Sequence, residues 1–562
     1  MKKQPFHLKN EDVMLTIDGM NHEGLGVARL DGMAVFVQGA LIGEVVKAHL
    51  IKVASTYAVA RVLELEEASL ERQEPFCPAF KRCGGCSLQH MTYTETLRFK
   101  HQVVLDSLER LGGFKDIVVK PVLGMDHPYK YRNKAQYPVG LLGTKPVAGF
   151  YSRRSHEIVD ASACGIQHPS SELVRAAVLT WIVENKVPIY SEETEKGLIR
   201  HIVVRVGVRT GEVMAMLVAT KNRIPFAEKL VNKLRKQVPG ITGIVLNVNS
   251  VPGNVVLGQE NYILFGSPII EDKLCDMTFE ISPLSFYQVN PDQTEVLYRK
   301  AMDCAALTGT ETVFDLYCGI GTISLVAAKN AVRVIGVEAV EEAVETAREN
   351  ARRNGMGNVE FHLGNAEDVV PKLYEAGIRA DVVIVDPPRK GCDHQLLQTI
   401  LAMRPERIVY VSCNPSTLAR DLKVLCGSGV QAAVTDIAPD ASTASKSDVA
   451  QEAVTASKSD AAQEAVTASK SDAAQEAVTA SKSVAAQEAV TASKSDAAQE
   501  AVTASKSDAA QEAVTASKSD AQDVEMKTAS NGVYRISSVQ PVDMFPWTEH
   551  VETLVLMSRV KE

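Results

Sequence analysis

The sequence predicts an α/β protein whose C-terminal half forms a doubly wound parallel sheet, preceded by a small β-barrel and a central α+β region. From residue 312 onward, apolar β-branched runs alternate with helical segments, as in βαβ units. Residues 8–66 contain short β-like runs separated by glycines, and residues 69–285 mix turns with further β-like runs. The 562 residues, 45% of them hydrophobic, supply material for several cores.

The N-terminal region is expected to form a barrel of the OB kind. Four short runs have strand character, at residues 13–17, 34–37, 44–48 and 57–62, and glycines separate them. Short strands at near-regular spacing are typical of this scaffold, which commonly binds oligonucleotides.

Charge is distributed unevenly along the chain. The net charge of -9 argues against a uniformly basic coat, but residues 71–160 hold 14 Lys and Arg against 9 Asp and Glu. Aromatic side chains such as Phe80, Tyr93 and Tyr131 are scattered through this basic stretch. Cations bind phosphates and aromatic rings stack on bases, so the stretch suits an RNA surface. An ordinary solvated surface over an aromatic core is the simpler alternative.

Four cysteines in the central region have the spacing of a ligand set. Cys77, Cys83 and Cys86 form a C-x5-C-x2-C pattern, and Cys164 follows at a distance. Four thiolates suit either zinc or an iron–sulfur cluster, and the spacing alone does not choose between them. Four independent thiols are the remaining alternative. Ten cysteines in so long a chain do not make a disulfide scaffold.

The C-terminal region carries the strand and helix pattern of a doubly wound sheet. Its strands are expected at residues 312–316, 332–338, 381–386 and 407–411, and helices near 320–329 and 340–353. Apolar, β-branched runs of this kind fit strands that are buried on both faces.

A nucleotide site is expected where the first of these strands meets its helix. Residues 315–322, Asp-Leu-Tyr-Cys-Gly-Ile-Gly-Thr, supply a glycine turn, and Glu338 ends the next expected strand, where an acid can bind ribose hydroxyls. Position 324 is Ser where a dinucleotide fingerprint has its third glycine, which favours a single adenosine ligand over NAD. Asn365 and Asp386 follow strands at the same rim, although a helix cap or a turn is the alternative for each.

A reactive thiol is expected at the end of the strand 407–411. Cys413 precedes a helix that should start at Pro415, and the positive field at a helix N-terminus favours the nucleophilic thiolate. A buried structural cysteine is the alternative. Near the C-terminus, His550-Val551-Glu552 opens the last expected strand, although an isolated Glu is usually a solvated surface residue.

Residues 443–522 form an insertion of a different kind. A 12-residue unit, beginning with Thr-Ala-Ser-Lys-Ser, repeats from Thr443 with one large apolar residue per period. Successive valines would spiral around a helix, so the unit cannot bury enough apolar area to offset its chain entropy. We expect a disordered expansion in a surface loop of the catalytic region; a functional tether is the alternative.

Taken together, the motifs resemble the RNA uracil-5-methyltransferase family, in particular its bacterial 23S ribosomal RNA branch. The resemblance covers almost the whole chain except the repeat. It is carried by the four cysteines, the N-terminal barrel, and five ordered motifs at residues 285–290, 315–321, 386–389, 412–415 and 550–552. The repeat departs from the family pattern, because it stands between Cys413 and Glu552, which the family keeps far closer together in sequence.

The resemblance implies a fold, a cofactor and a set of roles. Residues 8–66 would be a TRAM domain, 69–285 a central domain whose four cysteines bind a [4Fe-4S] cluster, and 286–562 a class I methyltransferase domain dependent on S-adenosylmethionine. It implies Cys413 as the nucleophile on uracil C6 and Glu552 as the proton acceptor. It implies that the cofactor is bound by Gln288, Tyr317, Glu338, Asp386, Thr322 and Asn365.

Two other classes compete with this reading of the motifs. An amino-group methyltransferase also uses an Asp-Pro-Pro-like motif, but usually with an aromatic residue next, where this chain has Arg389. A non-enzymatic RNA chaperone would have no need of Cys413 and Glu552. Within the family, the tRNA branch typically lacks both the TRAM domain and the cysteine cluster.

The surroundings of the protein are also suggested by the sequence. No run of 18 apolar residues occurs, and the N-terminus has no apolar stretch of the secretory kind. We therefore expect a cytoplasmic monomer that acts on 23S ribosomal RNA, with no membrane segment and no obligate protein partner.

Overall fold

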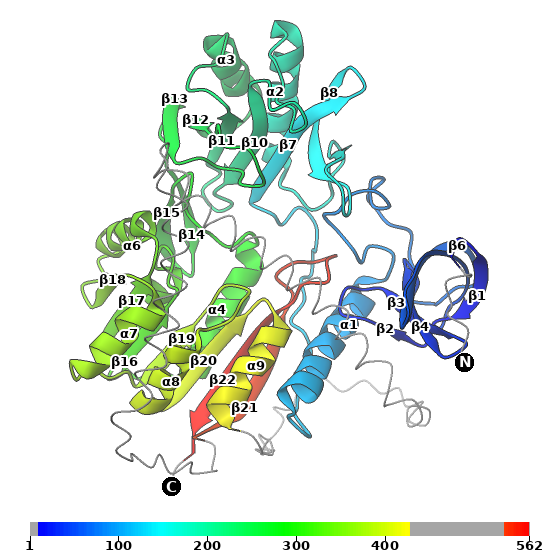
Figure 1. The fold of residues 1–562 in the computed structure, drawn as a ribbon. Coiled ribbons are helices and arrows are strands. Elements are labelled where there is room, and N and C mark those ends of the chain that lie inside the picture. The colour runs from blue at the N-terminus through cyan, green and yellow to red at the C-terminus, as the bar shows by residue number, and fades with distance from the viewer. Residues whose placement is uncertain (1–8, 428–532, 561–562) are drawn as a thin grey trace, which may run out of the picture.

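The structure is a computed structural model that describes residues 9–427 and 533–560. Figure 1 shows three units built around sheets: an N-terminal one in dark blue, a central one in cyan and green, and a C-terminal one in light green, yellow and red. The predicted repeat at residues 443–522 lies outside the described residues.

The N-terminal unit is a six-stranded sheet in the order β1-β5-β6-β4-β3-β2. All neighbouring strands are antiparallel except β4 and β6. Alternate residues of β5, among them Val46, Ala48 and Leu50, are fully buried and form one side of the core. The strands are β1 (Asp12–Thr16), β2 (Gly19–Met20), β3 (Gly26–Leu30), β4 (Met33–Gln38), β5 (Val45–Val53) and β6 (Tyr57–Glu67).

The central unit is a seven-stranded sheet in the order β13-β12-β11-β10-β7-β8-β9. Helices α2 (Pro169–Asn185) and α3 (Ala227–Gln237) supply the apolar residues that cover one face. From the other face Met214, Met216 and Val245 join the core of the C-terminal unit. The strands are β7 (Lys134–Leu142), β8 (Lys145–Tyr151), β9 (Ile158–Asp160), β10 (Ile199–Val206), β11 (Val213–Ala219), β12 (Ile241–Val248) and β13 (Glu260–Gly266).

The C-terminal unit is a seven-stranded sheet in the order β18-β17-β16-β19-β20-β22-β21. Five strands are parallel, namely β16 (Thr312–Leu316), β17 (Arg333–Glu338), β18 (Val359–Leu363), β19 (Val382–Val385) and β20 (Arg407–Ser412). Two are antiparallel at one edge, β21 (Tyr534–Val542) and β22 (Glu552–Arg559). The sequence predicts four of the five parallel strands, without β18, and a last strand that opens at residues 550–552. It does not give the antiparallel direction of that strand, because direction depends on pairing that a strand's own residues do not encode.

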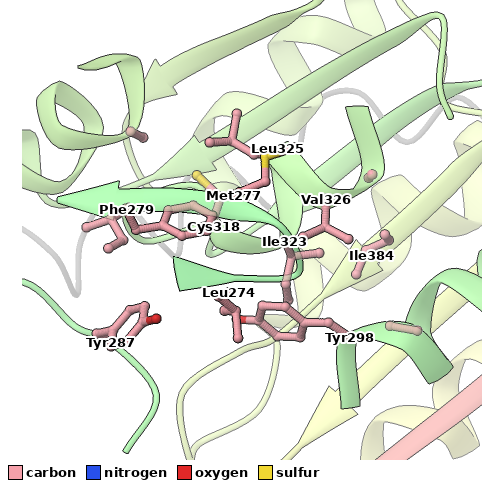
Figure 2. Packing of buried hydrophobic residues seen from close by; sticks show 14 of the residues in the cluster. Leu274, Met277, Phe279, Tyr287, Tyr298, Cys318, Ile323, Leu325, Val326 and Ile384 are labelled. Carbon is pink, nitrogen blue, oxygen red and sulfur yellow. The ribbon is translucent and has the colours of Figure 1, made fainter. Parts of the chain in front are cut away.

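Both faces of this sheet are covered by helices, as the continuous apolar runs require. Residues of each strand alternate between two cores: in β16, Val313 faces the first and Phe314 the second. Figure 2 shows the first core, where Ile323 and Val326 lie beside Ile384. The helices are α4 (Pro291–Ala305), α5 (Thr322–Ala328), α6 (Glu341–Arg353), α7 (Ala366–Glu375), α8 (His394–Met403) and α9 (Pro415–Cys426). A two-stranded sheet, β14 (Ile270–Leu274) and β15 (Met277–Ile281), packs into the same first core.

Residues 93–112 connect the N-terminal unit to the C-terminal one. Helix α1 (Tyr93–Asp106) continues into a π-helical turn, η2 (Ser107–Gly112), and together they supply Val104 and Leu108 to the second core. Lys100 of α1 is fully buried and forms an ion pair with Asp543, which follows β21. The loop between β21 and β22 is thereby fastened to α1.

Within residues 9–427 and 533–560, no helix combines the length and the apolar character needed to cross a membrane.

Candidate active site

A cavity of about 1000 Å³ lies where the central and C-terminal units meet. It opens at the carboxyl ends of β16 and β19, the two neighbouring strands at which the strand order reverses. Open α/β sheets bind their ligands at such a switch point. The twelve candidate residues named from the sequence all line this cavity: Cys77, Cys83, Cys86, Cys164, Gln288, Tyr317, Thr322, Glu338, Asn365, Asp386, Cys413 and Glu552.

The turn between β16 and α5 has the backbone geometry that its glycines predict. Tyr317, Gly319 and Gly321 all have positive φ, at 65°, 56° and 81°. A Cβ added to Gly321 would stand 2.9 Å from the ring of Phe361, so no larger residue fits there without a shift. Thr322 begins α5, and its hydroxyl forms a 2.8 Å hydrogen bond with that of Tyr298.

Glu338 closes the far side of this turn. It ends β17, and its carboxylate accepts hydrogen bonds from the backbone N–H of Gly319 at 3.0 Å and of Val340 at 2.9 Å. Asn365 occupies the N-cap position of α7, but its side chain makes no capping hydrogen bond and instead donates to Asp368 at 3.0 Å. Asn365 therefore stands at the cap position, as the helix-cap interpretation expects, but its side chain does not cap the helix.

Gln288 enters the cavity from the segment that joins the central and C-terminal units. The backbone C=O of Gln288 accepts a 2.9 Å hydrogen bond from the side-chain amide of Asn133, and the Asn133 N–H donates to Val289 at 3.0 Å. These two contacts fix the segment 288–289 to the start of β7.

Two carboxyls stand near the carboxyl ends of the neighbouring strands β19 and β16. Asp386 follows β19 directly, and burial raises its pKa to about 7. Asp315, within β16, is fully buried and accepts a hydrogen bond from the Ser324 hydroxyl at 2.5 Å. Burial raises the pKa of Asp315 to about 7 as well. Ser324 thus has a partner inside the protein at the position where a dinucleotide fingerprint has glycine.

The strand register brings Cys413 and Glu552 together. In the antiparallel pair of β20 and β22, Ser412 lies opposite Thr553. Cys413 follows Ser412 and Glu552 precedes Thr553, so the two side chains project from neighbouring positions at the same end of the sheet. Glu552 is 2% exposed, which excludes the interpretation of an ordinary surface glutamate. Burial, and then the charge of Asp386, raise its pKa well above the usual value.

The state of the Cys413 thiol differs from the sequence-based prediction. Helix α9 begins at Pro415 as expected, but burial, and then the charges of Glu552 and Asp386, raise the pKa of Cys413 to about 11. The guanidinium of Arg389 acts in the opposite direction without outweighing them. Burial and the two carboxyls thus leave the pKa of Cys413 raised in the free protein, where the sequence analysis expected surroundings that favour the thiolate.

Arg389 is a site residue that the sequence analysis did not assign. Its guanidinium lies 3.4 Å from Nε2 of His550 and favours the ionised forms of both Cys413 and Glu552. Its backbone C=O accepts hydrogen bonds from Asn414 and Thr417, each at 3.1 Å, so the loop after β19 is tied to the start of α9. The feature of the sequence that could have identified Arg389 as a site residue is its position directly after Asp386-Pro387-Pro388.

The four central cysteines line one wall of the same cavity. All four are free thiols and partly buried. Burial, and then the neighbouring thiols with Cys164 first among them, raise the pKa of Cys86 to about 12. In the described part of the chain, no three or more His, Cys, Asp or Glu side chains are arranged so that they could hold a metal ion.

Sequence comparisons identify the family. A family model described as tRNA (Uracil-5-)-methyltransferase matches residues 225–433, and a TRAM domain model matches residues 9–63. An uncharacterized RNA methyltransferase of Halalkalibacterium halodurans is 49% identical over 438 residues, which are 78% of this chain and 95% of that protein. The chain belongs to the RNA uracil-5-methyltransferase family. An uncharacterized RNA methyltransferase of Clostridium tetani is also 49% identical to this enzyme, over 76% of the chain and 92% of the relative.

A solved structure supports the fold of this RNA methyltransferase. The Pyrococcus abyssi tRNA (uracil-54, C5)-methyltransferase, solved with S-adenosyl-L-homocysteine, matches with a TM-score of 0.64 over 97% of this chain and 100% of that chain, at 23% identity. The C-terminal unit of the enzyme therefore has the class I methyltransferase fold, and its N-terminal sheet is a TRAM domain.

Proposed function

We propose that the enzyme forms 5-methyluridine in 23S ribosomal RNA, with S-adenosylmethionine as methyl donor and a covalent bond between Cys413 and uracil C6. The register of β20 and β22 carries the proposal, because it places a thiol and a buried carboxyl side by side at the rim of a nucleotide-sized cavity. Uracil C5 methylation needs this pair of groups and little else from the protein.

The two groups act in sequence on one base. The Cys413 thiolate bonds to C6 of the uracil, and the electron pair of the C5–C6 double bond moves toward O4 to give an enolate. C5 of the enolate then carries the nucleophilic electron pair and would take up the methyl group of a sulfonium donor, the electron pair of the broken S–CH3 bond remaining on sulfur. Glu552, as the carboxylate, removes the proton left on C5, the double bond re-forms, and the thiolate is expelled. The raised pKa of Glu552 suits a group that must accept this proton.

The cavity fits the cofactor that this chemistry needs. When bound, S-adenosylmethionine supplies an electrophilic methyl group on a cationic sulfonium. Glu338 presents carboxylate lone pairs suited to ribose hydroxyls, and Asp386 places a carboxyl at the switch point. Gly319 lines the cavity with a positive φ and no protein atom beside its Cβ position, so the backbone there can approach a ligand closely. Gln288, Tyr317, Thr322 and Asn365 complete the proposed contacts.

The proposal includes a [4Fe-4S] cluster held by the four central cysteines, although their side chains are not arranged as a metal-ion site in the described structure. The four thiols share one cavity wall, and the pKa values of Cys77, Cys83 and Cys86 are raised in part by the neighbouring thiols. Ionisation of such thiols becomes favourable when a cation or cluster binds the thiolates. The cluster would stabilise the loop at residues 77–86, and no step of methyl transfer requires it.

The test is methylation of purified ribosomal RNA and of tRNA, with 5-methyluridine mapped by nuclease digestion and mass spectrometry. Wild-type enzyme should modify 23S RNA, and Cys413→Ala should not. Cys304→Ala is the matched control, since Cys304 lies on α4 and does not line the cavity. With RNA containing 5-fluorouridine, wild-type enzyme should form a covalent adduct that survives denaturation.

The outcomes separate the alternatives. Methylation of tRNA alone would reject ribosomal RNA as the substrate but would leave the proposed methylation mechanism standing. Turnover by Cys413→Ala would reject the covalent mechanism. If folded enzyme supplied with S-adenosylmethionine formed 5-methyluridine in neither RNA, the proposed function would be rejected.

A further inference from the structure

The two walls of the active-site cavity carry opposite charge. In the described chain, the residues that line the cavity from positions 77–167 include no Asp or Glu, but they include Arg132 and Lys134. The lining residues from positions 286–552 include five acids: Glu338, Glu367, Asp386, Glu549 and Glu552. The proposed chemistry uses the acidic wall, and the proposed cluster uses the cysteines of the other wall, but neither gives Arg132 and Lys134 a role.

The basic wall is built by the start of β7. Successive side chains of an extended segment point to opposite sides, so Arg132, Lys134 and Gln136 share the side that faces the cavity. Between them, Asn133 and Ala135 are buried. Asn133 holds this segment against residues 288–289, so the basic wall is positioned rigidly beside the proposed cofactor contact Gln288.

Lys134 is a cation without a partner. Within the described residues its ammonium has neither a hydrogen bond nor an ion pair, and Arg205 lies directly opposite it in the pairing of β7 with β10. Burial, and then the charges of Arg205 and Arg132, lower the pKa of Lys134 to about 7. A half-buried ammonium among guanidinium groups costs stability, and an anion in the cavity would offset that cost.

The cations also reach the reacting end of the cavity. The positive charge of Arg132 acts on His550, which in turn contacts Arg389 beside Cys413. An RNA strand that delivers a uracil to Cys413 must place its own phosphates within the same cavity. The second wall has five acids against the two cations Arg389 and Lys390, so its net charge disfavours phosphate, and the wall formed by β7 is the more favourable path for the strand.

We propose that Arg132 and Lys134 form a phosphate-binding site for the RNA strand next to the uracil, with Lys134 contacting one phosphodiester directly. The inference rests on the proposed function, because it assumes that an RNA base enters the cavity. It adds a binding role for β7 of the central unit. The carboxylate of the methyl donor is the other anion within reach, and the experiment distinguishes the two.

The test compares Lys134→Gln with Lys145→Gln. Lys145 is exposed on the next strand of the same hairpin and does not line the cavity. Both changes are made in the full-length Cys413→Ala protein, so that binding is measured without turnover, and the probe is an RNA fragment that the wild-type enzyme methylates. Lys134→Gln should weaken RNA binding roughly tenfold and reduce the slope of log K against log salt by about 0.7. Lys145→Gln should leave both unchanged.

A second arm identifies the phosphate. Replacing single phosphates around the target uridine by neutral methylphosphonates should weaken binding to the parent protein at one position and have no effect there on Lys134→Gln. Loss of repulsion from Arg205 and Arg132 means that Lys134→Gln should melt at the same temperature or higher, so misfolding cannot mimic the result.

Three outcomes would overturn the inference. RNA affinity and salt slope could be the same in Lys134→Gln as in the parent. The methylphosphonate could weaken both proteins equally. Calorimetry could show that Lys134→Gln loses affinity for S-adenosylmethionine and not for RNA, which would assign the cation to the cofactor carboxylate. Formation of 5-methyluridine by the wild type is measured separately, so a failure here leaves the proposed function standing.

Discussion

The buried ion pair between Lys100 and Asp543 gives a quantitative test of how the catalytic loop is held. Both side chains are fully buried, and Nζ of Lys100 lies 2.5 Å from Oδ1 of Asp543. The ammonium also donates to the C=O of Phe545 at 3.0 Å, and the Tyr93 hydroxyl donates to Oδ2 of Asp543 at 2.7 Å. The pair fixes the loop that leads to Glu552, from a helix that lies far earlier in the chain.

Lys100→Met removes the cation and leaves the carboxyl of Asp543 buried with a single hydroxyl donor. Breaking a buried pair in this way costs about 3–5 kcal/mol. For a unit of this size, each kcal/mol corresponds to about 2–4 °C, so the melting temperature should fall by roughly 6–20 °C. Lys100→Met/Asp543→Asn leaves no uncompensated charge and should recover at least about 1 kcal/mol relative to the sum of the single changes.

The assay is calorimetric melting, together with the methylation rate below the transition. Lys300→Met is the matched control, because Lys300 pairs with Asp303 at 3.0 Å but is 46% exposed, and exposed pairs contribute about 0–1 kcal/mol. The loosened loop should also lower kcat in Lys100→Met. A melting temperature indistinguishable from that of the wild type, or an equal loss in Lys300→Met, would refute the reasoning.

Four further predictions concern the site and the insertion. Iodoacetamide should alkylate Cys413 with an apparent pKa of about 11, and Arg389→Gln should raise that pKa further, because the guanidinium favours the thiolate; an unchanged or lower value would contradict this. Glu552→Gln should accumulate a covalent protein–RNA band on a denaturing gel, because the C5 proton is no longer removed; normal turnover would mean that another base acts. Protein purified without oxygen should contain iron and absorb visible light, whereas stoichiometric zinc without iron would reject the cluster. Excision of residues 443–522 should leave the melting temperature and the methylation rate nearly unchanged, and loss of either would show that the repeat contacts the domain or its substrate.

Local patterns predict the sheet of the C-terminal unit closely. The run 312–316 coincides with β16, and the predicted helix at 340–353 with α6 (Glu341–Arg353). Continuous apolar runs can be stable only where both faces of the sheet are covered, so the residues of these strands themselves indicate that the strands are buried on both faces. Tyr317, Glu338, Asp386 and Cys413 could be placed for the same reason, because each lies at or just after the carboxyl end of a predicted strand.

Contacts distant in sequence were not predictable in this way. Helix α1 lies within the basic stretch 71–160, yet it packs beside β21 and holds Asp543. The same stretch contains Lys134, and charge counting cannot tell a solvated lysine from one that faces a cavity. The division between central and catalytic regions at residue 285 stays a prediction, although β14 and β15, before that point, share the core of the C-terminal unit.

The ionisation of Cys413 illustrates a different limit. The sequence shows the helix that follows the thiol, and a helix N-terminus lowers a thiol pKa. The opposing groups, Asp386 and Glu552, belong to segments well before and far after Cys413, so the local sequence does not reveal them. Their combined effect with burial exceeds that of Arg389. A bound base and a bound cofactor would change this balance, so thiolate formation is expected to depend on assembly of the complete site.

The topology explains how Cys413 and Glu552 can be far apart in sequence and still adjacent in space. After Cys413, α9 runs back from the rim for 12 residues, about 18 Å at 1.5 Å each, and ends at Cys426. Strand β21 returns toward the rim from Tyr534, and Val542 lies opposite Glu552. Figure 1 shows α9 alongside β21 and β22, with the described chain interrupted at the end far from the rim. The described chain therefore ends and resumes, at residues 427 and 533, on the side opposite the cavity. The register of three neighbouring strands, and not proximity along the chain, brings the two reacting groups together.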